Sequence, residues 1–309
     1  MERFAVCGGV AGAKINLLLD VVGRRSDGYH RIDGVMQTVT FGDDLTVTLD
    51  REGEGLRVRI PEDAGIPADR TNLVWRAAEA FLSRRSLPGG ITVTLTKRIP
   101  VAGGLAGGST DAAGVLRLLN RIAGADALSP EELLAVAQML GADVPFCLLC
   151  PGGAMRTQGI GEVLTPVPAL PDCAIVVAKS GEGVSTPWGY GQLDALYGDF
   201  SDRQTETARR VDAMLSALQA GDLDRIAAAC YNIFEEAVIP VRPRVRELKD
   251  RMLETGARVA MMSGSGPSVF GIFTDREAAA RLVSRLCRTG VQAFLTEPAR
   301  TEGEKGELL

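Results

Sequence analysis

The sequence predicts a mixed α+β protein with two domains, and three observations lead to this prediction. Strand-like and helix-like segments are intermixed in both halves of the chain without a regular β-α-β alternation, which disfavours a doubly wound parallel sheet. The chain has 309 residues, enough for about two domains of ordinary size. Three prolines, Pro166, Pro168 and Pro171, interrupt the middle of the chain and mark a boundary. We therefore expect an N-terminal domain over residues 1–160 and a C-terminal domain over residues 161–309.

The first half carries signals for both strands and helices. Some short segments alternate in polarity or are rich in β-branched residues, as strands are. Some longer segments carry an apolar stripe or helix-end signals, such as the capping box formed by Ser129 and Glu132. The expected strands are 45–49, 56–60 and 91–95, and the expected helices are 72–85, 109–123 and 129–140.

The second half follows the same mixed pattern. Its last residues, 301–309, are charged and contain glycine, so we expect a frayed end. The expected strands are 174–178, 258–262, 268–273 and 291–295, and the expected helices are 205–220, 223–237, 244–254 and 276–288.

Charge and histidine content exclude several classes of function. With a net charge of −5 and an isoelectric point near 5.2, the protein is not expected to bind nucleic acid through bulk positive charge. The single histidine, His30, removes most zinc sites and most Ser-His or Cys-His catalytic groups. The chemistry is therefore expected to rest on glycine loops, carboxylates, lysine and hydroxyl groups.

No feature of the sequence predicts export or attachment to a membrane. The chain lacks the run of about 18 apolar residues that a transmembrane helix needs, and its start lacks a signal-peptide pattern. The six cysteines are scattered in apolar surroundings, as expected for free thiols in a reducing compartment. We expect a cytoplasmic protein whose partner is a small molecule, with no nucleic acid and no membrane involved. The oligomeric state stays open.

The strongest chemical signal is a glycine-rich run at residues 100–113. Four glycines and two alanines fall within the seven residues 102–108, directly before an apolar helix expected to begin at Ser109. Small residues let backbone N–H groups approach an anion, and a helix N-terminus adds donors and a favourable dipole. The run lacks the lysine of a Walker A loop and does not match G-x-G-x-x-G. We interpret it as a phosphate-binding loop rather than a flexible surface loop. Its candidate residues are Pro100, Val101, Ala102, Gly103, Gly104, Leu105, Ala106, Gly107, Gly108, Ser109 and Thr110.

Three further segments have both a structural and a functional interpretation. The glycine cluster at 263–267, between two expected strands, fits either a hairpin turn or a second wall for phosphates or substrate. Lys14 lies in an apolar run, so its ammonium must find a partner or reach the surface. Asp143 follows a helix in a tight apolar loop, where, taken alone, an Asx-turn is the simpler interpretation than catalysis.

Taken together, these segments resemble the GHMP kinase superfamily, which includes galactokinase, homoserine kinase, mevalonate kinase and phosphomevalonate kinase. The resemblance covers nearly the whole chain. The run at 100–113 is similar to the superfamily's ATP-binding motif, and 262–267 is similar to its C-terminal motif. Ala102 and Ala106 stand where many relatives have glycine; because alanine is small, we expect the loop to keep its fold. Four runs resemble bacterial members that act on a cytidine-diphosphate-linked methylerythritol, namely Ala13-Lys14-Ile15-Asn16-Leu17, Asp27-Gly28-Tyr29-His30, Lys97-Arg98-Ile99-Pro100 and Gly141-Ala142-Asp143-Val144-Pro145.

The resemblance implies a GHMP-kinase-like fold, with a ribosomal-protein-like βαβ N-terminal domain and a ferredoxin-like α/β sandwich after it. It implies transfer of the γ-phosphoryl of ATP to the 2-hydroxyl of the methylerythritol unit, in the non-mevalonate route to isoprenoid precursors. By match, Asp143 is the base and Lys14 lies beside it as a close ion-pair partner. Mg²⁺ is expected, with Ser109 as a ligand.

Recognition of the cytidine end, by the same resemblance, needs a stacking ring and a group that reads the base edge. Tyr29 and His30 match these roles, and Tyr190 matches a second stacking ring, with Trp188 as the rival. Asn72 is expected at the adenine site. The implied substrate-binding residues are Asn16, Tyr29, His30, Lys97, Tyr190, Gly264 and Ser265. Two alternatives remain: another GHMP small-molecule kinase of homoserine or mevalonate type, and a regulator that binds nucleotide without transferring phosphate.

Overall fold

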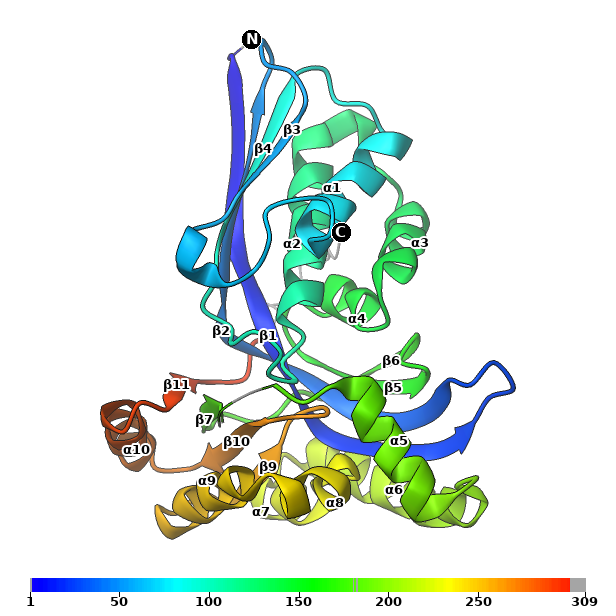
Figure 1. The fold of residues 1–309 in the computed structure, drawn as a ribbon, viewed down its shortest axis with the longest axis vertical. Coiled ribbons are helices and arrows are strands. Elements are labelled where there is room, and N and C mark those ends of the chain that lie inside the picture. The colour runs from blue at the N-terminus through cyan, green and yellow to red at the C-terminus, as the bar shows by residue number, and fades with distance from the viewer. Residues whose placement is uncertain (1, 180, 182, 301–309) are drawn as a thin grey trace.

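The computed structural model describes residues 2–179, 181 and 183–300. Within this part of the chain, the larger sheet has seven strands in the order β3-β4-β2-β1-β8, with β5 paired to β2 and β6 paired to β5 (Figure 1). The strands are β1 (Phe4–Arg24), β2 (His30–Asp50), β3 (Leu56–Arg59), β4 (Gly90–Thr96), β5 (Ala154–Gly159), β6 (Val163–Val167) and β8 (Tyr231–Asn232).

The antiparallel pair β1–β2 runs through both halves of the molecule (Figure 1). Gly12 pairs with Gly42, but Lys14 pairs with Thr38, so the register shifts where β2 has extra residues. An irregularity of this kind bends and twists a strand pair. Above the shift β2 pairs with β4, and below it β2 pairs with β5. The shift therefore places Lys14 at the junction between the two halves.

Helices cover one face of the upper part of this sheet (Figure 1). Apolar side chains of α1 and α2, such as Phe81 and Leu116, meet those of β2 and β4 in one buried core. The helices are α1 (Leu73–Arg84), α2 (Gly107–Ala123), α3 (Pro130–Leu140) and α4 (Val144–Leu149), and short 3₁₀ turns are η1 (Glu62–Ala64) and η2 (Gly124–Asp126).

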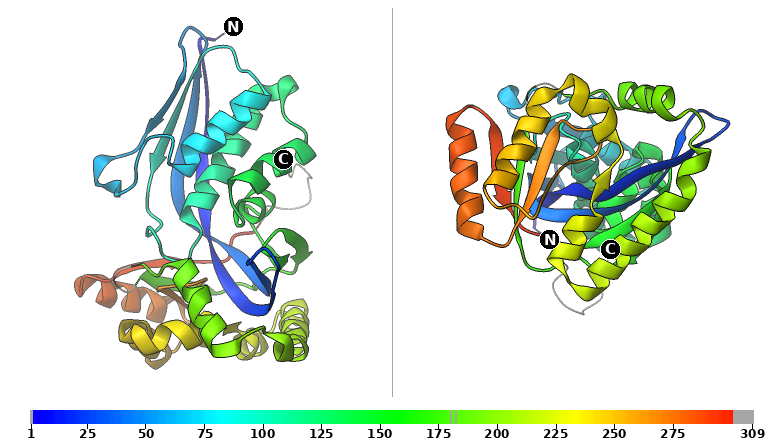
Figure 2. Two further views of the ribbon diagram at one scale, coloured as in Figure 1. Left: turned by 45° about the vertical axis from the view of Figure 1, so that its right-hand side comes forward. Right: turned by 90° about the horizontal axis from the view of Figure 1, so that it is seen from below.

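A second, antiparallel sheet has the order β11-β7-β10-β9. Seen from below, α10 and α6 lie on opposite sides of the lower half, and α6 packs against β1 and β2 (Figure 2). The strands are β7 (Ala174–Lys179), β9 (Val259–Met262), β10 (Ser268–Phe273) and β11 (Gln292–Thr296). The helices are α5 (Thr186–Tyr197), α6 (Gln204–Ala220), α7 (Leu223–Ala229), α8 (Phe234–Val238), α9 (Pro243–Glu254) and α10 (Arg276–Arg288), with 3₁₀ turns η3 (Ser201–Arg203) and η4 (Ile239–Val241).

The predicted mixture of strands and helices is confirmed, but the sequence patterns predict only residues 45–49 of β2 and do not predict β1, β5, β6, α4 or α5. Asp143, expected in a loop, lies at the start of α4. Two predicted elements also differ from the structure. The helix expected over 223–237 is wrong, because Tyr231 and Asn232 are extended and pair with β1, which separates α7 from α8. The helix expected to begin at Ser109 begins at Gly107 instead. The first sheet continues past residue 160 to Val167, and the domain boundary at residue 160 stays a prediction. The descriptions of the N-terminal domain as ribosomal-protein-like and of the C-terminal domain as ferredoxin-like also stay predictions. The expected frayed end lies outside the described residues.

A buried ion cluster fastens α2 to the upper sheet. The Lys97 ammonium, just after β4, bonds to the carboxylates of Asp43 on β2 and Asp111 on α2, and all three side chains are buried. Asp43 also accepts from the backbone N–H of Arg98 and Ile99, whereas Asp111 Oδ1 has no partner among the described residues. Burial raises the pKa of the Asp111 carboxyl well above its usual range, despite the attraction of Lys97.

This cluster predicts a pH dependence of stability. Above the usual carboxyl pKa of about 4, folded Asp111 holds a proton that the unfolded chain releases, so the free energy of unfolding falls as pH rises through this window. Asp111→Asn removes the titration. Urea unfolding at pH 5 and pH 8 should show the free energy of unfolding of the wild type falling between the two pH values relative to that of the variant. Asp126→Asn, an exposed carboxylate, is the control, and an equal change in both variants would contradict the prediction.

Candidate active site

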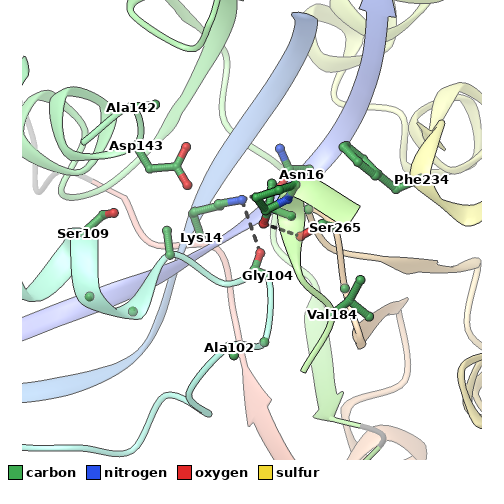
Figure 3. A pocket seen from close by; sticks show the side chains of 18 of the residues that line it. Lys14, Asn16, Ala102, Gly104, Ser109, Ala142, Asp143, Val184, Phe234 and Ser265 are labelled. Atoms are coloured by element: carbon green, nitrogen blue, oxygen red, sulfur yellow. Dashed lines mark hydrogen bonds between the residues drawn. The ribbon is translucent and has the colours of Figure 1, made fainter. Parts of the chain in front are cut away.

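A cavity of about 1050 Å³ opens at the junction of the two halves. Its wall takes residues from β1, the glycine loop before α2, the start of α4, α5 and the turn between β9 and β10 (Figure 3). The site residues expected from the sequence line this cavity, apart from Leu105 and Thr110. Leu105 is buried in the core, and the Thr110 hydroxyl donates to the backbone carbonyl of Gly12 at 2.6 Å, so both face away.

The first turn of α2 presents unpaired donors to the cavity. The first backbone bond of the helix runs from Thr110 N to Ala106 O, so the N–H groups of Gly107, Gly108 and Ser109 have no partner inside the helix. Ser109 lies in this turn and its hydroxyl makes no hydrogen bond with a described residue, so it does not cap the helix as expected. A 17-residue helix that points its N-terminus into a cavity is suited to bind phosphate.

Ala102 and Ala106 both adopt the left-handed backbone conformation, with φ of 53° and 57°. An L-residue there costs about 1 kcal/mol or more compared with its preferred conformations, and glycine avoids this cost. Alanine at these two positions therefore strains the backbone but does not prevent the left-handed conformation.

The Lys14 ammonium lies at the centre of the cavity wall and is held by two neutral acceptors. It donates to Asn16 Oδ1 at 2.6 Å and to the Gly104 carbonyl at 3.2 Å, and its residue is 5% exposed. The close ion pair with Asp143 that the sequence suggested is absent among the described residues, where Asn16 and Gly104 are the acceptors of the ammonium. The positive charge of Lys14 is thus not neutralised by a bonded carboxylate.

Asp143 occupies the N-terminal end of α4 and points its carboxylate toward Lys14 (Figure 3). It caps no N–H group with its side chain, which excludes the Asx-turn interpretation, and it has no hydrogen bond or ion pair with a described residue. Its charge nevertheless reaches two neighbours. Burial and, to a smaller extent, Asp143 raise the pKa of Tyr190 and of Cys147, each to about 12.

The second glycine cluster meets the first loop backbone to backbone. Gly104 has φ of +75°, and a Cβ on it would come within 2.1 Å of the Ser263 carbonyl, so only glycine fits at this contact. Ser265 forms a 2.9 Å hydrogen bond with Thr186 at the start of α5. The cluster at 263–267 is therefore both a turn between strands and a wall of the cavity, which combines the two interpretations left open by the sequence.

Aromatic rings form the end of the cavity away from α2. His30 stacks on Tyr190 with ring centroids 4.4 Å apart, and its Nε2 bonds to Asp194 Oδ1 at 2.7 Å. Tyr29 is 61% exposed at the rim. Trp188 does not belong to the described lining, so the geometry favours Tyr190 over Trp188 as a ring that faces a ligand.

Two expected binding residues have their polar groups engaged elsewhere. Asn72 caps α1 by accepting from Val74 N at 2.8 Å, and its amide donates to the Pro67 carbonyl. Lys97 lies under the first turn of α2, where a Cβ on Gly107 would approach its ammonium to 3.2 Å. It therefore belongs to the phosphate-loop end of the cavity, whereas the sequence suggested the substrate end.

Sequence reasoning missed residues of the wall that come from distant segments. Asp194, which also pairs with Arg24 at 3.4 Å, lies inside α5 and no local pattern marks it. Thr186 precedes a proline, which is a helix-start signal but not a binding signal. For Asp111, the available sequence signal is its position directly after the glycine-rich residues 102–108.

The part of the chain that the structure describes has neither a membrane-spanning helix nor a metal-binding cluster of His, Cys, Asp or Glu side chains. No helix is long and apolar enough to span a membrane. No group of three or more His, Cys, Asp or Glu side chains is arranged to hold a metal ion. The described cysteines are free thiols, and Cys147 and Cys150 are buried.

Comparison with known proteins agrees with the geometry. The chain matches the model for the GHMP kinase N-terminal domain over residues 72–150 and that for the GHMP kinase C-terminal region over residues 214–292. A homoserine kinase structure from Cytophaga hutchinsonii superposes with a TM-score of 0.71 at 18% identity, over 97% of this chain and 96% of that one. At this identity the likeness concerns the fold alone.

Two nearer relatives share one name. The 4-diphosphocytidyl-2-C-methyl-D-erythritol kinase of Alkaliphilus metalliredigens is 42% identical over 85% of this chain and 86% of its own length. A crystal structure of 4-(cytidine 5'-diphospho)-2C-methyl-D-erythritol kinase superposes with a TM-score of 0.78 at 33% identity, over 96% of this chain and 100% of that one. The chain therefore belongs to the GHMP kinases, and within them to the 4-diphosphocytidyl-2-C-methyl-D-erythritol kinase family.

Proposed function

We propose that this protein transfers the γ-phosphoryl group of ATP to the 2-hydroxyl of 4-diphosphocytidyl-2-C-methyl-D-erythritol, in the non-mevalonate route to isoprenoid precursors and in the cytoplasm. Membership of the kinase family supports the reaction type. The observation that carries the proposal is the facing pair of Lys14 and Asp143, which lies in the same cavity as the open N-terminus of α2 (Figure 3).

The residues divide the reaction between them. Asp143 accepts the proton of the hydroxyl as its oxygen attacks the γ-phosphorus, the bond from that phosphorus to the bridging oxygen breaks, and ADP leaves. A tertiary alcohol is hindered and weakly acidic, so a placed base and good alignment both matter. Lys14 stabilises the negative charge that develops between the two reactants, and its ammonium is suited to this because no carboxylate neutralises it.

Mg²⁺ is part of this proposal. The Ser109 hydroxyl and the Asp143 carboxylate are oxygen donors at the α2 end of the cavity, and neither has a hydrogen-bond partner among the described residues. Hard oxygen donors of this kind, completed by phosphate oxygens and water, suit Mg²⁺. When bound, the ion supplies neutralisation of phosphate charge. We propose Ser109 as its protein ligand.

Recognition of the cytidine end is assigned to the ring cluster. Tyr29 at the rim and Tyr190 in the wall supply aromatic faces for a planar base, and His30, which stacks on Tyr190, has its ring fixed by Asp194. A homoserine or mevalonate kinase has no evident need for such rings, which is why the cytidine substrate is preferred here. Asn16, Gly264 and Ser265 line the region between the rings and Lys14.

The base assigned to Asp143 predicts a large loss of turnover on one change. Asp143→Asn should lower kcat at least about 100-fold, because an amide cannot accept the proton, with a smaller effect on the KM for ATP. Steady-state kinetics with coupled detection of ADP measure both constants. Asp172→Asn, which alters an exposed surface carboxylate, should behave as wild type. Unchanged turnover in Asp143→Asn would remove this residue from the base role.

The ring cluster predicts a selective loss of substrate affinity. Asp194→Ala removes the acceptor that fixes His30, so the KM for the cytidine substrate should rise about tenfold while the KM for ATP stays within about twofold. The KM for ATP is the internal control, since the glycine loop does not contact Asp194. A parallel rise of both constants would indicate general distortion of the cavity instead.

The substrate itself is tested by direct comparison of acceptors. Purified protein with ATP and Mg²⁺ should release ADP with 4-diphosphocytidyl-2-C-methyl-D-erythritol and show no comparable turnover with homoserine or mevalonate. Turnover only with one of the latter two would overturn the assignment in favour of another GHMP kinase. Nucleotide binding without transfer to any of the three alcohols would favour a regulator.

A further inference from the structure

The position of the Lys14 ammonium depends on a backbone carbonyl that a second residue shares. Gly104 O accepts from Lys14 Nζ at 3.2 Å and from the Ser263 hydroxyl at 3.0 Å. Ser263 is fully buried, and its own N–H donates to the Ser268 carbonyl, so its backbone is held in place. The hydroxyl of Ser263 therefore helps to decide where the Gly104 carbonyl, and with it the ammonium, can lie.

Asn232 in turn fixes the segment that carries Ser263. Its side-chain amide donates to the carbonyls of Met262 and Gly264 at 2.7 and 2.8 Å, one on each side of Ser263. Its Oδ1 accepts from Phe234 N at 3.0 Å, so the polar atoms of this buried side chain all have partners. A fully satisfied buried polar group of this kind holds its neighbours in one arrangement.

These contacts close a ring that begins and ends on β1. Asn232 lies on β8, whose two residues pair with Leu18 and Leu19 of β1. Lys14 and Asn16 lie on the same strand, a few residues earlier. The path thus runs from β1 through β8, Asn232 and Ser263 to Gly104, and back to β1 through the Lys14 ammonium.

We propose that Asn232 and Ser263 are positioning residues for Lys14: they hold the Gly104 carbonyl at the place where it orients the ammonium toward the cavity. This inference rests on the proposed function for the role of Lys14. It extends that function to two residues that need not touch either substrate, and it explains why a segment of the second half is required for chemistry carried by β1. A misplacement of about 1 Å in a reacting group can lower a rate about 100-fold, so small shifts matter here.

The test uses Ser263→Ala with a matched control. Ser268 begins β10 directly after the turn that carries Ser263, is equally buried, and its hydroxyl has no hydrogen-bond partner among the described residues, so Ser268→Ala removes a hydroxyl without removing a bond. Ser263→Ala should lower kcat about tenfold with both KM values within about twofold, and Ser268→Ala should keep the kcat of wild type. Equal losses in the two variants, or a normal kcat in Ser263→Ala, would overturn the proposal.

Combination with Lys14→Met separates positioning from a general structural role. If Ser263 acts through Lys14, the double variant should have the residual turnover of Lys14→Met within about twofold, because the ammonium to be placed is gone. Multiplied losses would overturn the proposal. Asn232→Asp, which keeps the shape but replaces the donor amide by an acceptor, should show the same dependence on Lys14 and provides a second variant should Ser263→Ala fold poorly.

A structural measurement separates this inference from the proposed substrate. A crystal structure of Ser263→Ala should show the Gly104 carbonyl or the Lys14 ammonium displaced by about 1 Å, with the 3.2 Å hydrogen bond lost. An unchanged bond overturns the proposal even if the protein phosphorylates the expected alcohol. A displaced ammonium supports it even if another alcohol is the substrate.

Discussion

The antiparallel pairing of β1 with β2 is the constraint on which the rest of the molecule depends. The pair is shared by both halves, and its register shift lies beside Lys14. Close to this shift, β11 contacts β2. Phe41 stacks on Phe294 with ring centroids 4.1 Å apart, and the hydroxyl of Thr40 forms a hydrogen bond with that of Thr296. The junction is therefore held by hydrogen bonds and ring packing from both ends of the chain. The walls of the cavity at this junction come from both halves of the molecule and are joined by the β1–β2 pair.

The meeting of two glycine loops is the second consequence of this frame. Their backbones approach so closely at Gly104 that a side chain has no room, which explains a glycine requirement that flexibility alone does not. The same loop tolerates left-handed alanines at 102 and 106, where space exists and strain is the cost. Close approach and positive φ are thus separable reasons for small residues, and only the first is absolute at this site.

Local signals in the sequence predicted local structure well. The capping box at Ser129 and the glycine run before α2 report interactions between residues a few positions apart, and both are present. What failed depends on distant partners. The helix is interrupted at Tyr231 and Asn232 because these residues pair with β1. The sequence of 223–237 contains no signal for this pairing with a distant strand. The sequence suggested Asp143 as the partner of Lys14 and predicted neither acceptor: Asn16 is two residues away, and Gly104 is brought close by the fold.

The two buried lysines of the cavity show how the fold assigns charge. Lys97 forms ion pairs with two carboxylates, which neutralise its charge and join α2 to the sheet. Lys14 is bonded to an amide oxygen and a peptide carbonyl, which orient the ammonium without cancelling it. An anionic ligand in the cavity is therefore attracted by Lys14 and by the N-terminus of α2, and far less by Lys97. Burying a cation against neutral acceptors carries a desolvation cost, which a bound phosphate group would offset. Lys14 is thus kept in a state that favours a charged ligand, which is the condition that transfer of a phosphoryl group requires.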